Sequence, residues 1–380
     1  MTPGTGRGAG SAAPRSVDVA RLAGVSQKTV SRVFNDEPYV SAEVRRRVLD
    51  AAEQLGYRLN NAARALASGR TRSIGVVTLG TALYGPASLL MGVERAVRDT
   101  GYALRVVNTM EGDPAGVAGA MDSLLDQGVD GIVISEPIDE QADVGAPALR
   151  LDVPVLVIGA PLPVTAPTVL TAGNGADLMA RSATEHLLDL GHMTVHHLAG
   201  PQRWYAARDR REGWQAALTA QDREVPAVVA GDWSAASGYR AGRELAEDAG
   251  VTAVFAANDD MAIGLIHALT EAGRRVPEDV SVVGFDDIPV AAHVTPPLTT
   301  VRQPFDAVAQ EGLKRLVHAI ENPKAEPLPP SGPPVDLVVR ASTAPPPSSR
   351  KTPARGRRSA SPAARTSRPP LANGGPSTRR

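Results

Sequence analysis

The first apolar pattern along the chain predicts two short helices separated by a glycine turn. In residues 16–23 the apolar positions gather on one side of a helix, namely Val17, Val19, Ala20 and Ala23. Gly24 supplies the turn, and Ser26 is placed to N-cap a second helix. The inward-facing positions of that helix are Val30, Val33 and Phe34, and its polar face carries Gln27, Lys28, Ser31 and Arg32. The pattern predicts a helix-turn-helix, with an ordinary helical hairpin as the alternative.

A third helix follows, capped by Ser41 and ending at Leu55 before Gly56. Its apolar stripe consists of Val44, Val48, Leu49, Ala52 and Leu55. This helix would close a small three-helix core. The next segment, about 61–67, predicts an alanine-rich hinge helix that is too short and too polar to be stable by itself.

From residue 73 onward, apolar runs alternate with helical segments. The first series is IGVVTL, LRVVNT, GIVIS and PVLVIG, and the second is VHHLAG, AVVAG, AVFAA and VSVVGF. Near-continuous apolar strands interleaved with helices predict parallel sheets covered on both faces. Because these strands are too many for one tidy sheet in a chain of this length, we expect two Rossmann-like lobes.

Composition adds exclusions and a charge gradient. The chain has no cysteine, which excludes disulfides, thiol catalysis and thiolate metal sites. It shows no secretory signal and no apolar run long enough for a membrane span, so we expect a cytoplasmic protein that does not contact a membrane. The net charge of −1 conceals +2 in residues 1–15, +3 in 16–70 and +9 in 345–380, which leaves −15 for 71–344. A basic head on an acidic body fits a polyanion bound by the head.

A set of short runs is arranged as in one known family. Near the N-terminus these runs are DVARLAGVS, TVSRVFN, LGY and IGV, and further along they are LGH, LAGP, GDWSAASGY, ANDDMAIG, VSVVGFDD and PPLTTVRQ. Together they resemble the head, hinge and effector domain of the lactose-repressor (LacI-type) family of bacterial transcription regulators. The resemblance therefore covers most of the chain.

The resemblance implies an α/β protein with a three-helix head and a hinge helix, joined to two Rossmann-like lobes of the periplasmic-binding-protein type. We expect a disordered N-terminal extension at 1–15, a helix-turn-helix domain at 16–59, a hinge helix and linker at 60–71, a two-lobed effector-binding and dimerisation domain at 72–344, and a disordered basic tail at 345–380. The N-lobe would take about 72–171 and 305–330, and the C-lobe about 174–301 and 335–344. The chain would cross between them near 170–174, 301–304 and 330–335.

The family motif also assigns DNA-binding positions. Gln27, Lys28 and Arg32 match side chains that read base edges in the major groove. The positions that contact phosphates or fix the helix match Ser26, Thr29, Ser31 and Asn35. In the hinge the matching positions are Asn60, Ala63 and Leu66. In this family a leucine at the place of Leu66 wedges into the minor groove, although packing against the lobes is an alternative. The implied assembly is a homodimer on a palindromic operator in double-stranded DNA.

Candidate effector-binding residues stand near the carboxyl ends of strands, where open α/β sheets bind ligands. The places of the family's ligand-gripping set hold Arg210, Asn258, Asp286 and Gln303, and positions lining the other lobe match Leu79, Tyr84 and Pro86. Trp233 resembles an aromatic platform for a sugar ring. Two positions depart from the pattern: Gly159 replaces a frequent carboxylate, and Gly175 with Ala176 replaces a common Asp-Asn pair. We expect a sugar or glycoside effector, with a purine or a sugar phosphate as alternatives.

A Rossmann-type enzyme is the main rival class. The chain has no G-x-G-x-x-G after its first strand, no P-loop lysine and no G-x-S-x-G elbow. His196 and His197 are consecutive on a strand and point to opposite faces, which argues against a shared metal ion. A free-standing sugar receptor is the third class, and the basic head argues against it. We therefore expect a repressor without cofactor, metal or catalytic residues, whose operator binding is controlled by a small-molecule effector.

Overall fold

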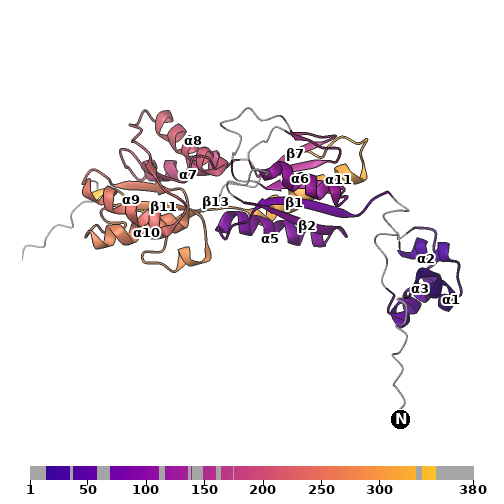
Figure 1. Cartoon of the computed structure of the whole chain (residues 1–380). Coiled ribbons are helices and arrows are strands. Elements are labelled where there is room, and N and C mark those ends of the chain that lie inside the picture. Colours follow the sequence, from indigo (N-terminus) through magenta and orange to yellow (C-terminus); the bar gives the residue numbers. More distant parts are fainter. Residues whose placement is uncertain are drawn as a thin grey trace, which may run out of the picture.

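In the computed structural model the described residues are 14–34, 37–57, 69–110, 116–135, 138, 149–159, 164–173, 175–330 and 336–347. They form a small helical head and two α/β lobes, which confirms the predicted fold class (Figure 1). The predicted hinge helix lies outside these residues. Within the same ranges, no helix combines the length and the apolar run that crossing a membrane requires.

Local capping sets the ends of the head helices. They are α1 (Ser16–Ala23), α2 (Gln27–Phe34) and α3 (Ala42–Leu55). Gly24 turns the chain after α1 at a φ of 65°, a left-handed conformation that glycine adopts without strain. Ser26 and Ser41 cap α2 and α3 by accepting from backbone amides, and Gly56 ends α3 at a φ of 62°. The predicted turn, caps and stop are therefore confirmed.

The head core differs from the prediction at two positions. Its buried side chains are Val19, Ala20, Ala23, Val30, Val33, Val48, Ala51 and Ala52. Val17 is 36% exposed and Leu49 is 47% exposed, so both were wrongly assigned to the core. The apolar side of α3 is centred on the small residues Ala51 and Ala52, because α1 and α2 pack against that side.

Two of the three consecutive arginines of α3 fasten the head together. Arg45 donates to the carbonyls of Val33 and Glu37, both at 3.2 Å, beside the end of α2. Arg47 donates to the carbonyls of Ala23 and Gly24 at the turn after α1. These contacts satisfy carbonyls that have no partner inside their own helix.

The N-lobe is a parallel sheet with the strand order β2-β1-β3-β5-β7. Its strands are β1 (Ser73–Leu79), β2 (Ala103–Thr109), β3 (Gly131–Ser135), β5 (Val155–Ile158) and β7 (Val169–Ala172). Helices α5 (Tyr84–Arg98) and α11 (Phe305–Glu321) cover one face, and α6 (Gly116–Asp126) covers the other. A small ladder pairs β4 (Leu149–Arg150) with β6 (Val164–Thr165).

The C-lobe sheet has the order β13-β12-β11-β10-β8-β9 and is parallel except for β13. Its strands are β8 (His196–Ala199), β9 (Val229–Ala230), β10 (Ala253–Ala256), β11 (Ser281–Asp286), β12 (Thr299–Arg302) and β13 (Asp336–Val338). The helices are α7 (Ala176–Asp189) and α8 (Tyr205–Ala220) on one face and α9 (Ala235–Glu247) and α10 (Asp259–Glu271) on the other. The 3-10 helix η1 (Pro289–Ala292) follows β11.

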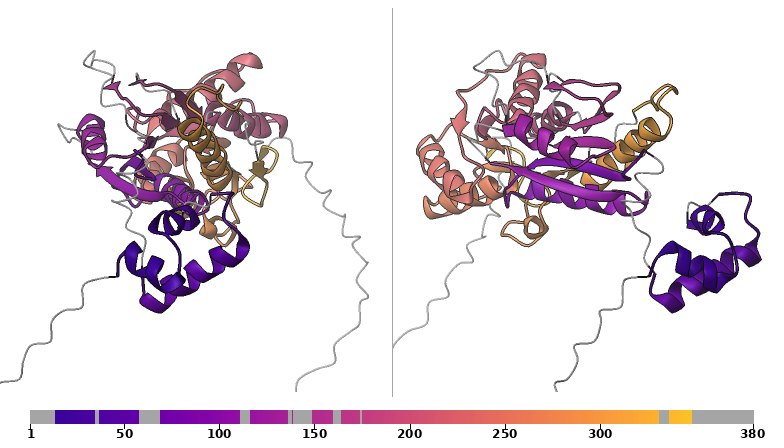
Figure 2. Two further views of the ribbon diagram at one scale, coloured as in Figure 1. Left: turned by 90° about the vertical axis from the view of Figure 1, so that its right-hand side faces the viewer. Right: turned by 45° about the vertical axis from the view of Figure 1, so that its right-hand side comes forward.

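The chain passes between the lobes more than once. β7 belongs to the N-lobe sheet and the following α7 packs in the C-lobe, whereas β12 is in the C-lobe and α11 returns to the N-lobe. β13 then pairs with β12 in the C-lobe. Figure 2 shows α11 running along the N-lobe although it comes late in the sequence, and it shows the head apart from both lobes.

Candidate functional site

The second head helix presents a polar face to solvent. Gln27, Lys28 and Arg32 are exposed, as a base-reading surface requires. The side chain of Gln27 donates to Ser16 Oγ at 2.9 Å, and Arg32 Nε lies 3.2 Å from a carboxylate oxygen of Glu37. Both contacts are at the surface, where such pairs contribute about 1 kcal/mol or less, so DNA can displace them.

The structure describes only some of the remaining predicted residues of the head and hinge. Ser26 Oγ accepts from the amide of Thr29 at 3.1 Å and shares a hydrogen bond with its hydroxyl at 2.8 Å, so both side chains fix the start of α2. Ser31 is exposed on the same helix. Asn35, Asn60, Ala63 and Leu66, which were assigned to DNA contacts, lie outside the described residues.

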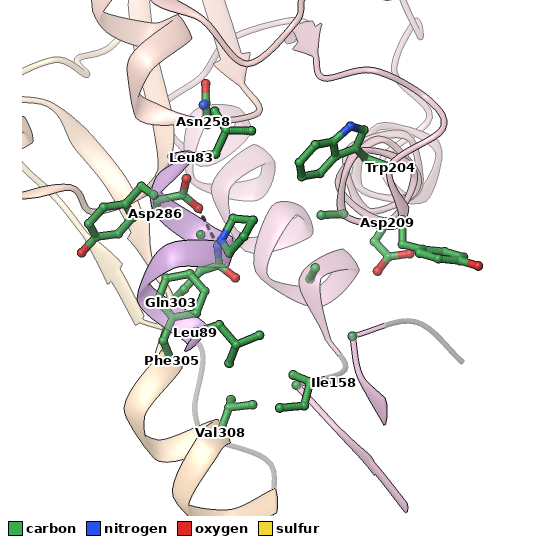
Figure 3. Close-up of a pocket in the computed structure, with 18 of the residues that line it drawn as sticks. Leu83, Leu89, Ile158, Trp204, Asp209, Asn258, Asp286, Gln303, Phe305 and Val308 are labelled. Carbon is green, nitrogen blue, oxygen red and sulfur yellow. Dashed lines mark hydrogen bonds between the residues drawn. The ribbon is translucent and has the colours of Figure 1, made fainter. Parts of the chain in front are cut away.

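A cavity of about 170 Å³ lies between the two lobes. Engineered protein cavities of about 150 Å³ hold one benzene molecule, so this space suits a ligand built around one ring. The ends of β3 and β5, helix α5 and the start of α11 line it from the N-lobe, and α7, α8, Trp233, Asn258 and Asp286 line it from the C-lobe (Figure 3). The site is therefore formed where the carboxyl ends of parallel strands from both sheets face each other.

Three of the predicted residues form one hydrogen-bonded group. Asp286 Oδ1 accepts from Arg210 Nη2 at 3.4 Å and from the side-chain amide of Gln303. Arg210 also donates to the carbonyl of Ala257, and its guanidinium carbon lies 3.9 Å from the centre of the Phe285 ring. Arg210 and Asp286 are more than nine-tenths buried although 76 positions separate them in sequence.

Burial shifts the pKa values of Asp286 and Arg210 away from their ordinary values. It raises the pKa of Asp286 to about 6, although Arg210 and the amide of Gln303 act in the opposite direction. Burial also lowers the pKa of Arg210. Each Nη of Arg210 carries two protons, and Asp286 has a second carboxylate oxygen, so the group retains both donors and acceptors for a ligand.

Asn258 and Trp233 have structural roles beside the cavity. Asn258 caps α10 by accepting from the amide of Met261 at 3.0 Å, and it donates to the carbonyl of Trp233 at 2.9 Å. Trp233 is 5% exposed, has a φ of 72°, and packs edge-on to Trp204 with ring centres 5.6 Å apart. Both predicted residues line the cavity, and their contacts hold the wall of the C-lobe in place.

Two neighbouring carboxylates, those of Asp259 and Asp287, accept hydrogen bonds from other residues of the protein. Asp259 accepts from the hydroxyl of Thr300 at 2.6 Å and from the amide of Ile288 at 2.8 Å. Burial and the nearby Asp286 carboxylate raise the pKa of Asp259 to about 8. Asp287 accepts from Arg302 at 2.8 Å and from Arg340 at 2.6 Å. These contacts satisfy the carboxylate oxygens of Asp259 and Asp287 without a ligand.

One predicted effector residue, Leu79, does not line the cavity. Tyr84 and Pro86, which were predicted with it, do line the cavity. Leu79 ends β1 and is buried in an apolar cluster with Trp204 and Ile138. Successive side chains of a strand point to opposite faces, so matching the end of a strand does not fix which face a residue takes.

Several lining residues were missed by the sequence analysis. The apolar ones include Leu83, Leu89, Ile158, Trp204, Phe305 and Val308, and the polar ones include Ser135 and Asp209. Ser135 and Ile158 end β3 and β5, so the rule that ligands bind at the carboxyl ends of strands could have identified them. Asp209 gave no sequence signal except its position beside Arg210.

Comparisons with known proteins agree with this geometry. The model of the bacterial regulatory proteins of the lacI family matches residues 17–60, and that of the periplasmic binding protein-like domain matches 184–343. The lactose operon repressor of Escherichia coli (strain K12) is 35% identical over 301 residues, which are 79% of this chain and 83% of the repressor.

Two solved structures are similar over most of the chain. A lac repressor dimer bound to operator and the anti-inducer ONPF gives a TM-score of 0.71 at 34% identity, covering 86% of this chain and 98% of that one. A complex of the transcriptional regulator CelR with cellobiose gives a TM-score of 0.60 at 32% identity, covering 87% of this chain and 99% of that one.

Proposed function

The chain belongs to the lacI family of bacterial regulatory proteins, and from this membership we propose that it is a DNA-binding repressor controlled by a sugar-type effector. Its relatives are transcription regulators rather than enzymes. The observation that carries the proposal is one polypeptide that joins an exposed recognition face on α2 to a polar cavity between two lobes. The proposed function is to couple occupancy of that cavity to operator affinity.

On DNA, the proposed base-reading residues are Gln27, Lys28 and Arg32. Arginine and lysine suit the acceptors of guanine, and glutamine suits adenine. The proposed positioning contacts come from Ser26, Thr29, Ser31, Asn35, Asn60 and Ala63, and Leu66 is the proposed wedge at the centre of the site. The lac repressor structure is a dimer on its operator, which supports a homodimer on a palindrome for this chain.

The effector is proposed to be a sugar or glycoside held between the lobes. Arg210, Asp286 and Gln303 supply hydrogen-bonding groups for hydroxyls, while Leu89, Ile158 and Val308 supply apolar surface. Such a division of polar and apolar walls suits a pyranose, which has hydroxyls at its edge and C–H groups on its faces. The cellobiose complex of CelR is a precedent among the relatives.

The proposed coupling uses the crossings between the lobes. A ligand that binds one relative position of the lobes better than another shifts the population toward it. Residues 69–72 lead directly into β1 of the N-lobe, so a change in the position of that lobe is proposed to reach the hinge that precedes them. The proposal includes a head at 16–59, a hinge at 60–71 and an effector domain at 72–344. It also includes a cytoplasmic location.

The test is selection of bound sequences from random DNA by the full chain, followed by titration of sugars against the selected operator. An inverted repeat is the expected product, and at least one sugar should change operator affinity. Asp286→Asn preserves side-chain volume and should abolish that response while operator affinity without sugar stays near normal. Gln303→Leu removes a donor at the cavity edge and should act in the same direction.

A single, unrepeated DNA site would refute the dimeric repressor. An operator response that persists in both variants would show that the effector binds elsewhere. Circular dichroism of each variant separates a loss of function from a loss of fold.

A further inference from the structure

Asp209 is a carboxylate of the interlobe cavity that neither the DNA-binding nor the fold-forming contacts use. It lies in the first half of α8, directly before Arg210, and lines the cavity. Figure 3 shows Asp209 and Trp204 on one side of the cavity and Asp286 and Gln303 on the other. Within the described part of the chain, the Asp209 carboxylate makes no hydrogen bond or ion pair, whereas Asp286 is held by Arg210 and Gln303.

The charges that line the cavity do not balance. Among its described lining residues only Asp209, Arg210 and Asp286 are ionisable to a full charge at neutral pH. Arg210 is paired with Asp286 at 3.4 Å, so Asp209 leaves an excess negative charge. Burial raises the pKa of the Asp209 carboxyl, and the nearby Glu212 and Asp177 raise it further, while Arg210 and Arg208 act in the opposite direction. The Asp209 carboxylate therefore lines the cavity without a cation in hydrogen-bonding contact, among the described residues.

We propose that Asp209 is an effector-contacting residue that makes the cavity select an uncharged, polyhydroxylated ligand and reject its phosphorylated or carboxylated forms. A hydroxyl group donates to the carboxylate and relieves its partial desolvation, and a hydrogen bond to a charged acceptor is stronger than one to a neutral acceptor. An anionic ligand would instead bring a second negative charge into a small, partly buried space.

The N-lobe wall of the cavity also favours an uncharged ligand. Gly159 directly follows β5 at the cavity and has no side chain to offer, and the neighbouring N-lobe surface includes Leu89, Ile158 and Val308. No cation among the described lining residues is left to neutralise a phosphate, because Arg210 already faces Asp286. The proposal rests on the proposed sugar-binding function and specifies the charge class of the effector for the same cavity.

The experiment compares neutral sugars with their anionic forms on the full chain. Glucose, ribose and cellobiose, and the phosphate monoesters of glucose and ribose, are tested at equal concentration by thermal shift. The affinity of each ligand that shifts the melting temperature is then measured by calorimetry. For the parent protein we expect at least one neutral sugar to bind and its phosphate ester to bind at least about tenfold more weakly.

Asp209→Asn removes the charge and preserves the shape. It should weaken binding of the neutral sugar and reduce, by about tenfold, the ratio between the affinities for that sugar and for its phosphate ester. Asp209→Ala also removes the acceptor and should weaken the neutral sugar further. Asp222→Asn is the matched control, because Asp222 is an exposed carboxylate just beyond the end of α8 that neither lines the cavity nor acts on the pKa of Asp209, and it should behave like the parent.

Each alternative result is decisive. A parent protein that binds the phosphate ester as tightly as the neutral sugar, or an Asp209→Asn variant with the parent's selectivity, would overturn the role of Asp209 and leave the sugar cavity intact. If no sugar of either kind binds the folded parent protein, the sugar-effector proposal itself fails.

Discussion

Asp130 holds the segment that leads into β1 of the N-lobe, and replacing it should release that segment. Its Oδ1 accepts from the amide of Thr71 at 3.0 Å and from the hydroxyl of Thr71 at 3.2 Å, and its Oδ2 accepts from the amide of Arg72 at 2.8 Å. The single hydroxyl proton of Thr71 is shared between Asp130 Oδ1 and the carbonyl of Gly128. One carboxylate thus fixes the two residues that precede β1.

The size of the effect follows from these contacts. A hydrogen bond in a protein makes a net contribution to stability of about 1 kcal/mol, and a hydrogen bond to a charged group contributes about 1.5–3 kcal/mol. Thr71 is half-buried and Arg72 is exposed, so water replaces some of the hydrogen bonds that are lost. We expect Asp130→Ala to lower the free energy of local opening by about 2 kcal/mol, which makes amide exchange at these residues about thirtyfold faster. Asp130→Asn keeps one acceptor and should have a smaller effect.

Native-state hydrogen exchange at the amides of Thr71 and Arg72 measures this directly. The control is Asp152→Asn, an exposed carboxylate that lines a surface groove together with Thr71 and Asp130. Operator binding should show the consequence: sugar affinity stays at the parent level, but the change in operator affinity that sugar produces becomes smaller. Exchange rates in Asp130→Ala equal to those of the control would refute the role of Asp130 in holding Thr71 and Arg72.

Two further predictions concern the head and the buried carboxylates. Arg32→Ala should reduce operator affinity by about 1–3 kcal/mol and spare binding to random DNA, measured by fluorescence anisotropy. An equal loss on both DNAs would make Arg32 a phosphate contact. Asp259 gives a pH dependence, because its pKa rises from 3.8 in the unfolded chain to about 8 in the folded one. The folded state therefore binds more protons between these values, and stability should fall as pH rises between them, whereas Asp259→Asn should flatten the curve in urea unfolding. A parent curve without that fall would contradict the assigned burial of Asp259.

The sequence alone was enough for the elements whose signals are local. Gly24, Ser26, Ser41 and Gly56 act within one turn of helix, so their roles as turn, caps and stop follow from residue type and spacing. β1 was predicted with the bounds it has, Ser73–Leu79, because a continuous apolar run marks a strand buried on both faces. The two lobes followed from counting such strands and from the family motifs.

Only the tertiary structure decided which side of an element a residue occupies. Leu49 and Ala51 are both apolar and close in the sequence, yet Leu49 is 47% exposed and Ala51 is buried. The position of α1 and α2 against α3 makes that choice. The position of Leu79 was open for the same reason, since its strand could present it to the cavity or to the core, and it lies in the core.

The composition of the cavity depends even more on the fold. Sequence motifs identified Arg210, Asp286 and Gln303, but their hydrogen bonds exist because α8, β11 and the crossing after β12 converge at one place. Asp259 and Asp286 each stand beside a strand's end, and only the loops around them show that Asp259 is tied to Thr300 while Asp286 faces the cavity. Periodicity and capping act over a few residues, whereas a cavity forms where distant segments pack and leave a space, so the role of Asp209 became visible only after both lobes were in place.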